Sequence, residues 1–114
     1  MNLKKKLENK VENYFKYFSK KDIKNLSLLF SNDIQIIDWQ SSIKRKKNAI
    51  DFNKKLFKKF KNINVRLIEK FFNYEKKSYA CKISIKLNKK KINVIDLIYF
   101  NSKFQIKKII AYLR

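Results

Sequence analysis

Four strand-like runs joined by very short links are the feature that most constrains the fold of this chain. The runs are rich in β-branched, aromatic and aliphatic residues and cover residues 65–74, 79–87, 92–100 and 105–113. The links between them, such as Asn88-Lys89-Lys90, hold only a few residues, mostly Asn, Ser and Lys. Links this short join antiparallel neighbours, because a parallel connection needs a crossover of about a dozen residues or more. The second half of the chain therefore predicts an antiparallel meander.

The start of the chain has the apolar spacing of helices instead. One helical face is made by residues three or four positions apart, namely Leu3, Leu7, Val11, Tyr14 and Phe18. Asp22 stands where a second, short helix over residues 23–30 needs an N-cap. The polar residues 31–33 are expected to end that helix.

A strand and a third helix are predicted before the meander. Residues 34–39 are β-branched around a polar Gln35 and predict a strand, whereas residues 40–47 are polar and basic and predict a loop. Asn48 is placed to cap a third helix with apolar positions at Ala49, Phe52, Leu56 and Phe60. Helices segregated from most of the strands indicate an α+β fold, formed by residues 1–114 as a single domain.

The composition contains neither glycine nor proline. Turns that need positive φ must therefore use Asn, Ser or Lys, of which Asn tolerates that conformation best. Hydrophobic residues make up 45% of the chain and aromatic residues 15%. This supply of apolar side chains is sufficient for a core and excludes a disordered chain, despite the high charge.

The formal net charge of +21 raises the question of a nucleic-acid partner. The cations are 27 lysines and only three arginines, whereas phosphate and base recognition favours arginine. Abundant Lys, Asn, Ile, Phe and Tyr with little Ala and no Gly or Pro is typical of coding by an AT-rich genome. We therefore favour a solvated lysine surface, and nucleic-acid binding is the less favoured alternative.

Several classes of site and location are not expected. The single cysteine, Cys81, cannot form an internal disulfide, and without histidine a zinc site is not expected. No cofactor is expected either. No apolar run is long enough to cross a membrane, and the start of the chain lacks the apolar stretch of a secretory signal. The expected location is the cytoplasm.

Three segments resemble the SnoaL-like and ketosteroid isomerase-like proteins of the nuclear transport factor 2-like superfamily. They are Leu29-Phe30-Ser31-Asn32-Asp33-Ile34, the run from Asn93 to Phe100, and Ile106-Lys107-Lys108-Ile109-Ile110-Ala111-Tyr112. Ala49 and Phe52 fall where the family has its third helix. The resemblance implies a cystatin-like cone, in which three N-terminal helices pack on a curved, mixed and mostly antiparallel sheet that encloses a pocket.

The same resemblance implies a set of site residues. Tyr14, Asp38 and Asp96 stand at the positions of the isomerase's helix tyrosine, its carboxylate base and its second carboxyl group. By that resemblance Asp38 removes a proton from a carbon next to a carbonyl, while Tyr14 and a protonated Asp96 donate hydrogen bonds to the oxygen. The residues around Asp96 are aliphatic, which favours a paired, neutral or pocket-lining carboxyl group. We expect all three side chains to point into one pocket.

Structural interpretations of these residues remain open. Tyr14 is also a natural core aromatic, Asp38 can end a strand and cap the next loop, and Asp96 can be a structural acceptor. The chain departs from the family at Trp39, which replaces a proline, and at Leu113, which replaces a tryptophan. A steroid is therefore not the expected substrate.

Two functions follow from these residues. The first is a small-molecule pocket protein that acts as a cofactor-independent isomerase or lyase on an apolar carbonyl compound. The alternative is a non-catalytic domain that binds a small hydrophobic ligand or a protein. We also expect a homodimer through the exposed face of the sheet, because the strands carry apolar residues on both faces and one domain covers only one of them.

Overall fold

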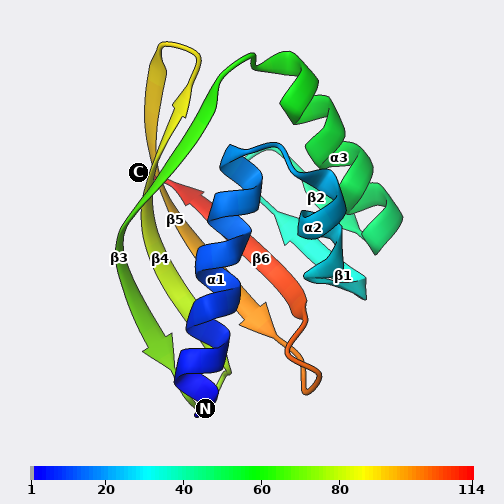
Figure 1. Ribbon diagram of the computed structural model, residues 1–114, viewed down its shortest axis with the longest axis vertical. Helices are drawn as coiled ribbons and strands as arrows, with labels where there is room; N and C mark the ends of the chain where they lie inside the picture. Colours follow the sequence, from blue (N-terminus) through cyan, green and yellow to red (C-terminus); the bar gives the residue numbers. More distant parts are fainter. Residues whose placement is uncertain (1) are drawn as a thin grey trace.

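Three helices pack on the concave face of a curved sheet in the computed structural model, which describes residues 2–114 (Figure 1). The helices are α1 (Leu3–Ser19), α2 (Ile23–Leu28) and α3 (Lys46–Lys59). The strands are β1 (Phe30–Ile37), β2 (Ser42–Lys44), β3 (Ile63–Asn73), β4 (Ser78–Leu87), β5 (Lys90–Phe100) and β6 (Ile106–Leu113). The α+β class and the helix-backed curved sheet are confirmed.

The sheet has the strand order β2-β1-β6-β5-β4-β3. The strands β3 to β6 form the predicted antiparallel meander, and β1 pairs with β2 antiparallel. The strand β1 pairs with β6 in parallel, so the sheet is mixed, as expected. This topology puts β6 in the interior of the sheet, between β1 and β5.

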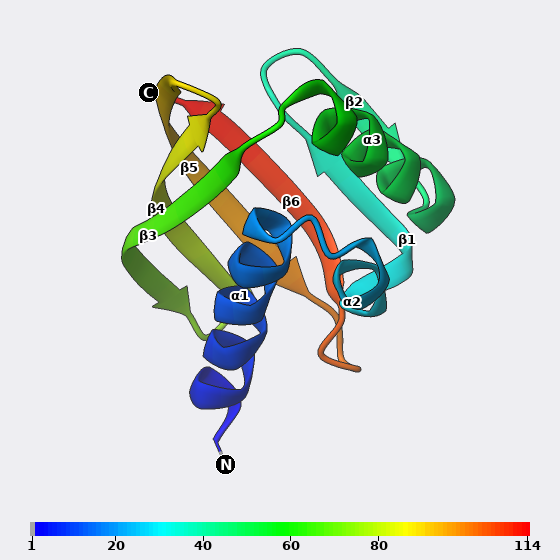
Figure 2. The same cartoon turned by 45° about the horizontal axis from the view of Figure 1, so that its top comes forward.

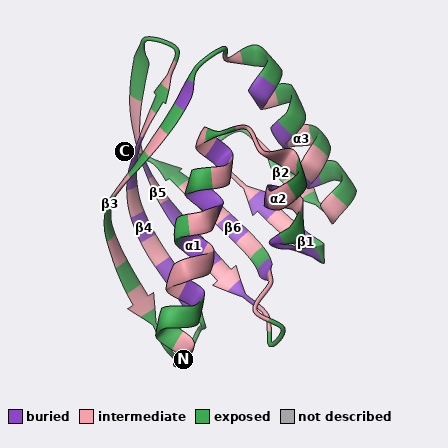
Figure 3. Ribbon diagram, in the orientation of Figure 1, coloured by how far each residue is buried: buried purple, intermediate pink, exposed green. Residues whose placement is uncertain are grey.

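The helices α1 and α3 cover different parts of the sheet, and α2 lies between them (Figure 2). The helix α1 packs on β3, and α3 packs on β1. Along β4 and β5 buried residues alternate with less buried ones, as expected for strands with one covered face (Figure 3). A bulge between Leu67 and Glu69 changes the register of β3 against β4.

Aromatic rings fill the space between α1 and the rest of the core. The ring of Tyr14 lies 5.1 Å from that of Phe15 and 6.4 Å from that of Phe30, centroid to centroid. Phe18 packs edge-on against Phe57 of α3 at 5.2 Å. All five rings are buried. The regular apolar spacing of α1 therefore mainly serves packing.

An outer apolar row crosses the opposite, convex face of the sheet. Register pairing places in one row Phe71, Ala80, Leu97, Ile110 and Ile37. Phe71 and Tyr112, which lies near this row, are exposed large apolar side chains. None of the helices within residues 2–114 covers this face.

The boundary between α2 and β1 differs from the prediction. The helix ends at Leu28, and residues 31–33 belong to β1 rather than to a link. Phe30 pairs with Ile106, and the backbone N–H of Ile106 donates to the carbonyl of Leu29 (2.8 Å). This pairing with a strand far along the sequence draws Phe30 out of the helix.

The segment before α3 also differs. The predicted loop contains the short strand β2, and α3 begins at Lys46, two residues before Asn48. The Asn48 side chain donates to the carbonyl oxygen of Lys44 (3.0 Å) instead of capping the helix. Arg45 is the N-cap residue, makes no side-chain capping bond and has φ 78° and ψ 144°. This is a region of backbone conformation that is favourable only for glycine.

Candidate functional site

Tyr14 and Asp96 meet in the interior, together with Cys81. Tyr14 comes from the middle of α1, while Cys81 and Asp96 are register partners on the neighbouring strands β4 and β5. Asp96 lies two positions from Val94 and two from Ile98 along β5, and all three are buried. Residues at every second position of a strand share a face, so the Asp96 side chain lies on the covered face of the sheet. Tyr14 is 6% exposed and Asp96 7% exposed. Two of the three predicted site residues therefore share one buried environment.

Burial changes the acidity of all three groups. It raises the pKa of the Asp96 carboxyl to about 7, as its aliphatic neighbours predicted. Burial also raises the pKa of the Tyr14 hydroxyl well above its usual value, and the charges of Asp96 and Cys81 raise it further. The pKa of the Cys81 thiol rises to about 12, chiefly through burial and then through the charge of Asp96. Near neutral pH a large share of Asp96 is protonated, so both Tyr14 and Asp96 can donate a hydrogen bond.

Asp38 lies directly after β1 and holds the turn to β2. Its Oδ1 accepts hydrogen bonds from the backbone N–H groups of Gln40 (2.8 Å) and Ser41 (2.6 Å). Its own N–H donates to the carbonyl of Ser41 (2.9 Å). The structural interpretation, in which Asp38 caps the loop after a strand, thus describes this geometry. Both bonds use Oδ1, so the lone pairs of Oδ2 stay available.

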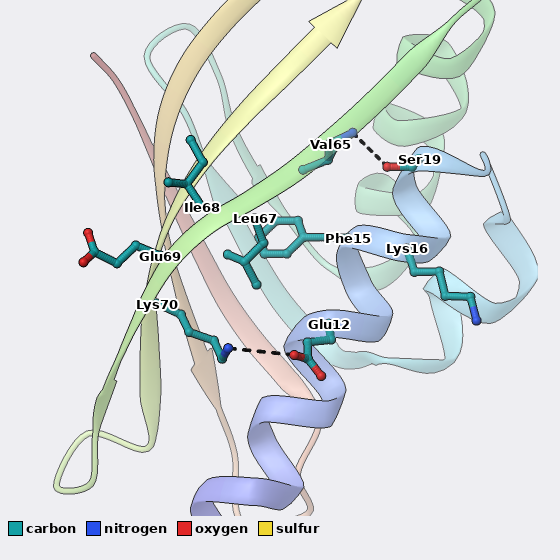
Figure 4. Close-up of a pocket in the computed structure, with 9 residues that line it drawn as sticks. All are labelled: Glu12, Phe15, Lys16, Ser19, Val65, Leu67, Ile68, Glu69 and Lys70. Atoms are coloured by element: carbon teal, nitrogen blue, oxygen red, sulfur yellow. Dashed lines mark hydrogen bonds and ion pairs between the residues drawn. The ribbon is translucent and has the colours of Figure 1, made fainter.

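An open groove lies between α1 and β3 (Figure 4). Its volume is about 470 Å³, and its lining consists of Glu12, Phe15, Lys16, Ser19, Val65, Leu67, Ile68, Glu69 and Lys70. The Ser19 hydroxyl accepts a hydrogen bond from the N–H of Val65 (2.9 Å) and ties the end of α1 to β3. Lys70 forms ion pairs with Glu8 (3.5 Å) and Glu12 (3.8 Å). The groove thus combines an apolar floor with a rim of both charges.

Phe15 connects this groove to the buried pair. Its ring lines the groove and packs edge-on against Tyr14. None of Tyr14, Asp38 and Asp96 lines the groove itself. Sequence reasoning missed Phe15 as a site residue, although its place beside Tyr14 on a helix already put the two rings on neighbouring faces.

A second groove lies at the C-terminal end of α1. It is bounded by the start of β3 and by the turn between β4 and β5. Its volume is about 520 Å³, and it is lined by Ser19, Lys20, Lys21, Lys61, Asn62, Ile63, Asn64, Lys86 and Asn88. The predicted site residues do not line this groove either. We call it the basic groove.

Three other features bear on possible functions, namely the exposure of Trp39, the possibility of a metal site and the possibility of a membrane-spanning helix. Trp39, which follows Asp38, is 46% exposed and lines neither groove. Within residues 2–114, no three His, Cys, Asp or Glu side chains lie close enough together to hold a metal ion. Across the same residues, no helix is both long and apolar enough to span a membrane.

Comparison with known proteins supports the fold through structure alone. No family model matches the sequence, and no curated protein matches it. Solved structures match it closely in fold. A SnoaL-like protein of unknown function from Burkholderia thailandensis matches with a TM-score of 0.83 and 7% identity, over 96% of this chain and 94% of that one.

Two further structures support the same fold. An NTF2-like protein of unknown function from Cytophaga hutchinsonii matches with a TM-score of 0.80 and 10% identity, over 95% of this chain and 89% of that one. A ketosteroid isomerase-like protein from Kribbella flavida matches with a TM-score of 0.82 and 10% identity, over 96% of this chain and 78% of that one. The chain therefore has the fold of the NTF2-like, SnoaL-like and ketosteroid isomerase-like proteins, as its sequence motifs suggested.

Proposed function

We propose that this protein binds a small apolar molecule that carries a hydrogen-bond acceptor such as a carbonyl oxygen. The observation that supports this most is the pairing of Tyr14 and Asp96, two groups able to donate hydrogen bonds in a largely apolar interior. Buried polar groups without a ligand or water to bond are costly, so a donor pair suits a bound acceptor. The ligand enters at the α1–β3 groove, with Phe15 moving aside to expose Tyr14.

Affinity measurements on tyrosine variants of α1 test this proposal. A panel of phenols, enones and other apolar carbonyl compounds is screened for ligands that raise the melting temperature, and a hit is measured by calorimetry. Tyr14→Phe removes one hydrogen bond and should weaken binding about 2- to 10-fold. The matched control is Tyr17→Phe, on the same helix but outside the groove and the buried pair. Equal losses for both variants, or no ligand from the panel, would contradict the proposal.

A second candidate is proton transfer with Asp38 as the base, the isomerase or lyase reaction that the family resemblance implies. It is favoured by one observation, that both hydrogen bonds to the carboxylate use Oδ1 and leave Oδ2 able to take a proton. In this reaction Oδ2 removes a proton next to a carbonyl and returns it at another carbon, while Tyr14 and Asp96 donate to the enolate oxygen. No cofactor takes part in these steps.

Asp38→Asn separates the two candidates. Asparagine keeps the Oδ1 acceptor of the turn and loses only the basic carboxylate, so the fold and ligand affinity should survive. If the protein turns over an enone, followed by ultraviolet absorbance, this variant should be slower by about 100-fold or more. An Asp38→Asn variant as active as the parent would eliminate Asp38 as the base, and an absence of turnover in the parent would leave binding as the function.

A further inference from the structure

The basic groove is a concave surface in which cations converge from separate parts of the chain. Lys20 and Lys21 follow α1, Lys61 precedes β3, and Lys86 lies near the end of β4. The segments that carry them lie at the same end of the molecule (Figure 2). No carboxylate is among the residues that line the groove. The α1–β3 groove differs, because Glu12 and Glu69 offset its lysines.

Hydrogen bonds fix the walls of the basic groove. The ammonium group of Lys21 donates to the carbonyl oxygens of Phe60 and Lys61, which satisfies backbone groups at the end of α3 and ties that end to α1. The N–H of Asn62 donates to Asn88 Oδ1 (3.0 Å), and the N–H of Asn88 donates to the carbonyl of Asn62 (2.8 Å). These bonds hold the start of β3 against the β4–β5 turn. The site is thus built before any ligand arrives.

The remaining three lysines of the groove form no ion pair with another described residue. The ion pairs of the described residues involve only Lys5 and Lys70, both with glutamates of α1. Within residues 2–114, the ammonium groups of Lys20, Lys61 and Lys86 therefore surround one concavity without an ion pair, and of the three only Lys20 has an electrostatic interaction with a nearby carboxylate, that of Asp22. Mutual repulsion of such charges favours an anionic ligand that replaces their counterions.

The lining also limits which anion fits. Ile63 is the sole apolar side chain, and no aromatic ring lines the groove, so neither an apolar ligand nor a stacked base is held. No arginine lines the groove, so the groove lacks the planar fork that binds guanine, carboxylate or phosphate through two parallel hydrogen bonds. Lysine and asparagine side chains contact phosphate oxygens through single hydrogen bonds, without reading sequence.

Lysines beyond the groove favour a long polyanion. Lys58 and Lys59 stand in the last turn of α3, shortly before Lys61, while Lys89 lies in the β4–β5 turn and Lys90 at the start of β5, next to Asn88. Duplex DNA carries about one negative charge per 1.7 Å of its axis, and lysines that bind its phosphates release condensed counterions, which favours binding. We propose that the basic groove binds the phosphate backbone of a nucleic-acid duplex without sequence preference, independently of the small-molecule function.

A charge-matched pair of variants tests this proposal. The groove variant changes Lys20, Lys61 and Lys86 to glutamine. The control variant changes Lys47, Lys54 and Lys55 to glutamine, which are exposed on α3 and line neither groove. Both variants lose three charges from the formal +21. Binding to a fluorescent 20-base-pair DNA of arbitrary sequence is followed by anisotropy between 50 and 200 mM salt, and circular dichroism checks the fold.

We expect the groove variant to bind DNA at least 10-fold more weakly than the parent at about 100 mM salt, and the control variant less than 3-fold more weakly. The slope of log K against log salt should fall by about 2 to 3 in the groove variant alone, since each lost phosphate contact accounts for about 0.9. Equal effects in the two variants would mean that overall charge binds the DNA and would overturn the proposal. A polyglutamate peptide that competes better than DNA of the same charge would also overturn it. If the triple variant does not fold, Lys61→Glu against Lys54→Glu makes the same comparison.

Discussion

Replacing Asp96 by asparagine should make the protein more stable at neutral pH, and the gain should disappear in acid. The pKa of this carboxyl is 3.8 in the unfolded chain and about 7 in the fold, where burial disfavours the ionised form. The difference is about three pKa units, or roughly 4 kcal/mol at ~1.36 kcal/mol per unit. Asparagine has a similar shape and never ionises, so it avoids this penalty.

The sign of the effect follows from which state ionises first. Below pH ~4 the carboxyl is protonated in both the folded and the unfolded chain, so Asp96 costs nothing. As the pH rises from about 4 to about 7, the unfolded chain ionises while the fold retains its proton, and the free energy of unfolding falls. Above pH ~7 both states are ionised and the penalty stays constant. The advantage of Asp96→Asn should therefore grow across this window and then level off.

Urea unfolding at pH 4, 6 and 8, followed by circular dichroism, measures this advantage. The difference in unfolding free energy between variant and parent should rise by up to about 4 kcal/mol from pH 4 to pH 8. The control is Asp51→Asn, which removes an exposed carboxylate from α3 and so measures the effect of losing one negative charge outside the core. A difference for Asp96→Asn that does not vary with pH, or that shrinks as the pH rises, would refute the argument that burial governs this carboxyl.

Two further predictions concern the backbone before α3 and the outer face of the sheet. Arg45→Gly should raise the unfolding free energy by about 1 kcal/mol, because relief of ~1–3 kcal/mol of strain exceeds the ~0.5–1 kcal/mol entropy cost of glycine. The melting temperature of Arg45→Gly should be higher than that of Arg45→Ala, and the reverse order would exclude backbone strain at this position. A homodimer through the outer apolar row should tighten between 50 and 500 mM salt, because screening weakens repulsion between copies of charge +21. Sedimentation should detect this dimer and its loss in Leu97→Glu, and a monomer at high salt and high concentration would contradict it.

The parts of the fold that depend on local sequence were predictable, and those that depend on distant pairing were not. The meander followed from short links, and the burial of Tyr14 followed from helical spacing. The local spacing predicts a helix at Phe30, whereas its actual strand partner, Ile106, lies far along the chain. The positive φ of Arg45 could not be predicted either, because arginine normally avoids that conformation.

The candidate site shows the same division. Periodicity placed Asp96 on the covered face of its strand, and its aliphatic neighbours predicted the direction of its pKa. The hydrogen bonds of the Asp38 carboxylate could not be predicted. They come from backbone N–H groups of the turn after β1, and the directions of those groups do not follow from the sequence. The basic groove joins lysines from three separate segments, so runs of lysine in the sequence did not indicate it.

The position of β6 in the interior of the sheet has a consequence for folding during synthesis. The strand bonds to β1 on one side and β5 on the other, so β1 has only the three-residue strand β2 beside it until β6 leaves the ribosome. Such non-local pairing slows folding and exposes strand edges that associate with other unfinished chains. The many lysines work against this association, because nascent chains of the same strong charge repel one another. The excess of positive charge can thus protect the growing chain during the interval in which its sheet is still incomplete.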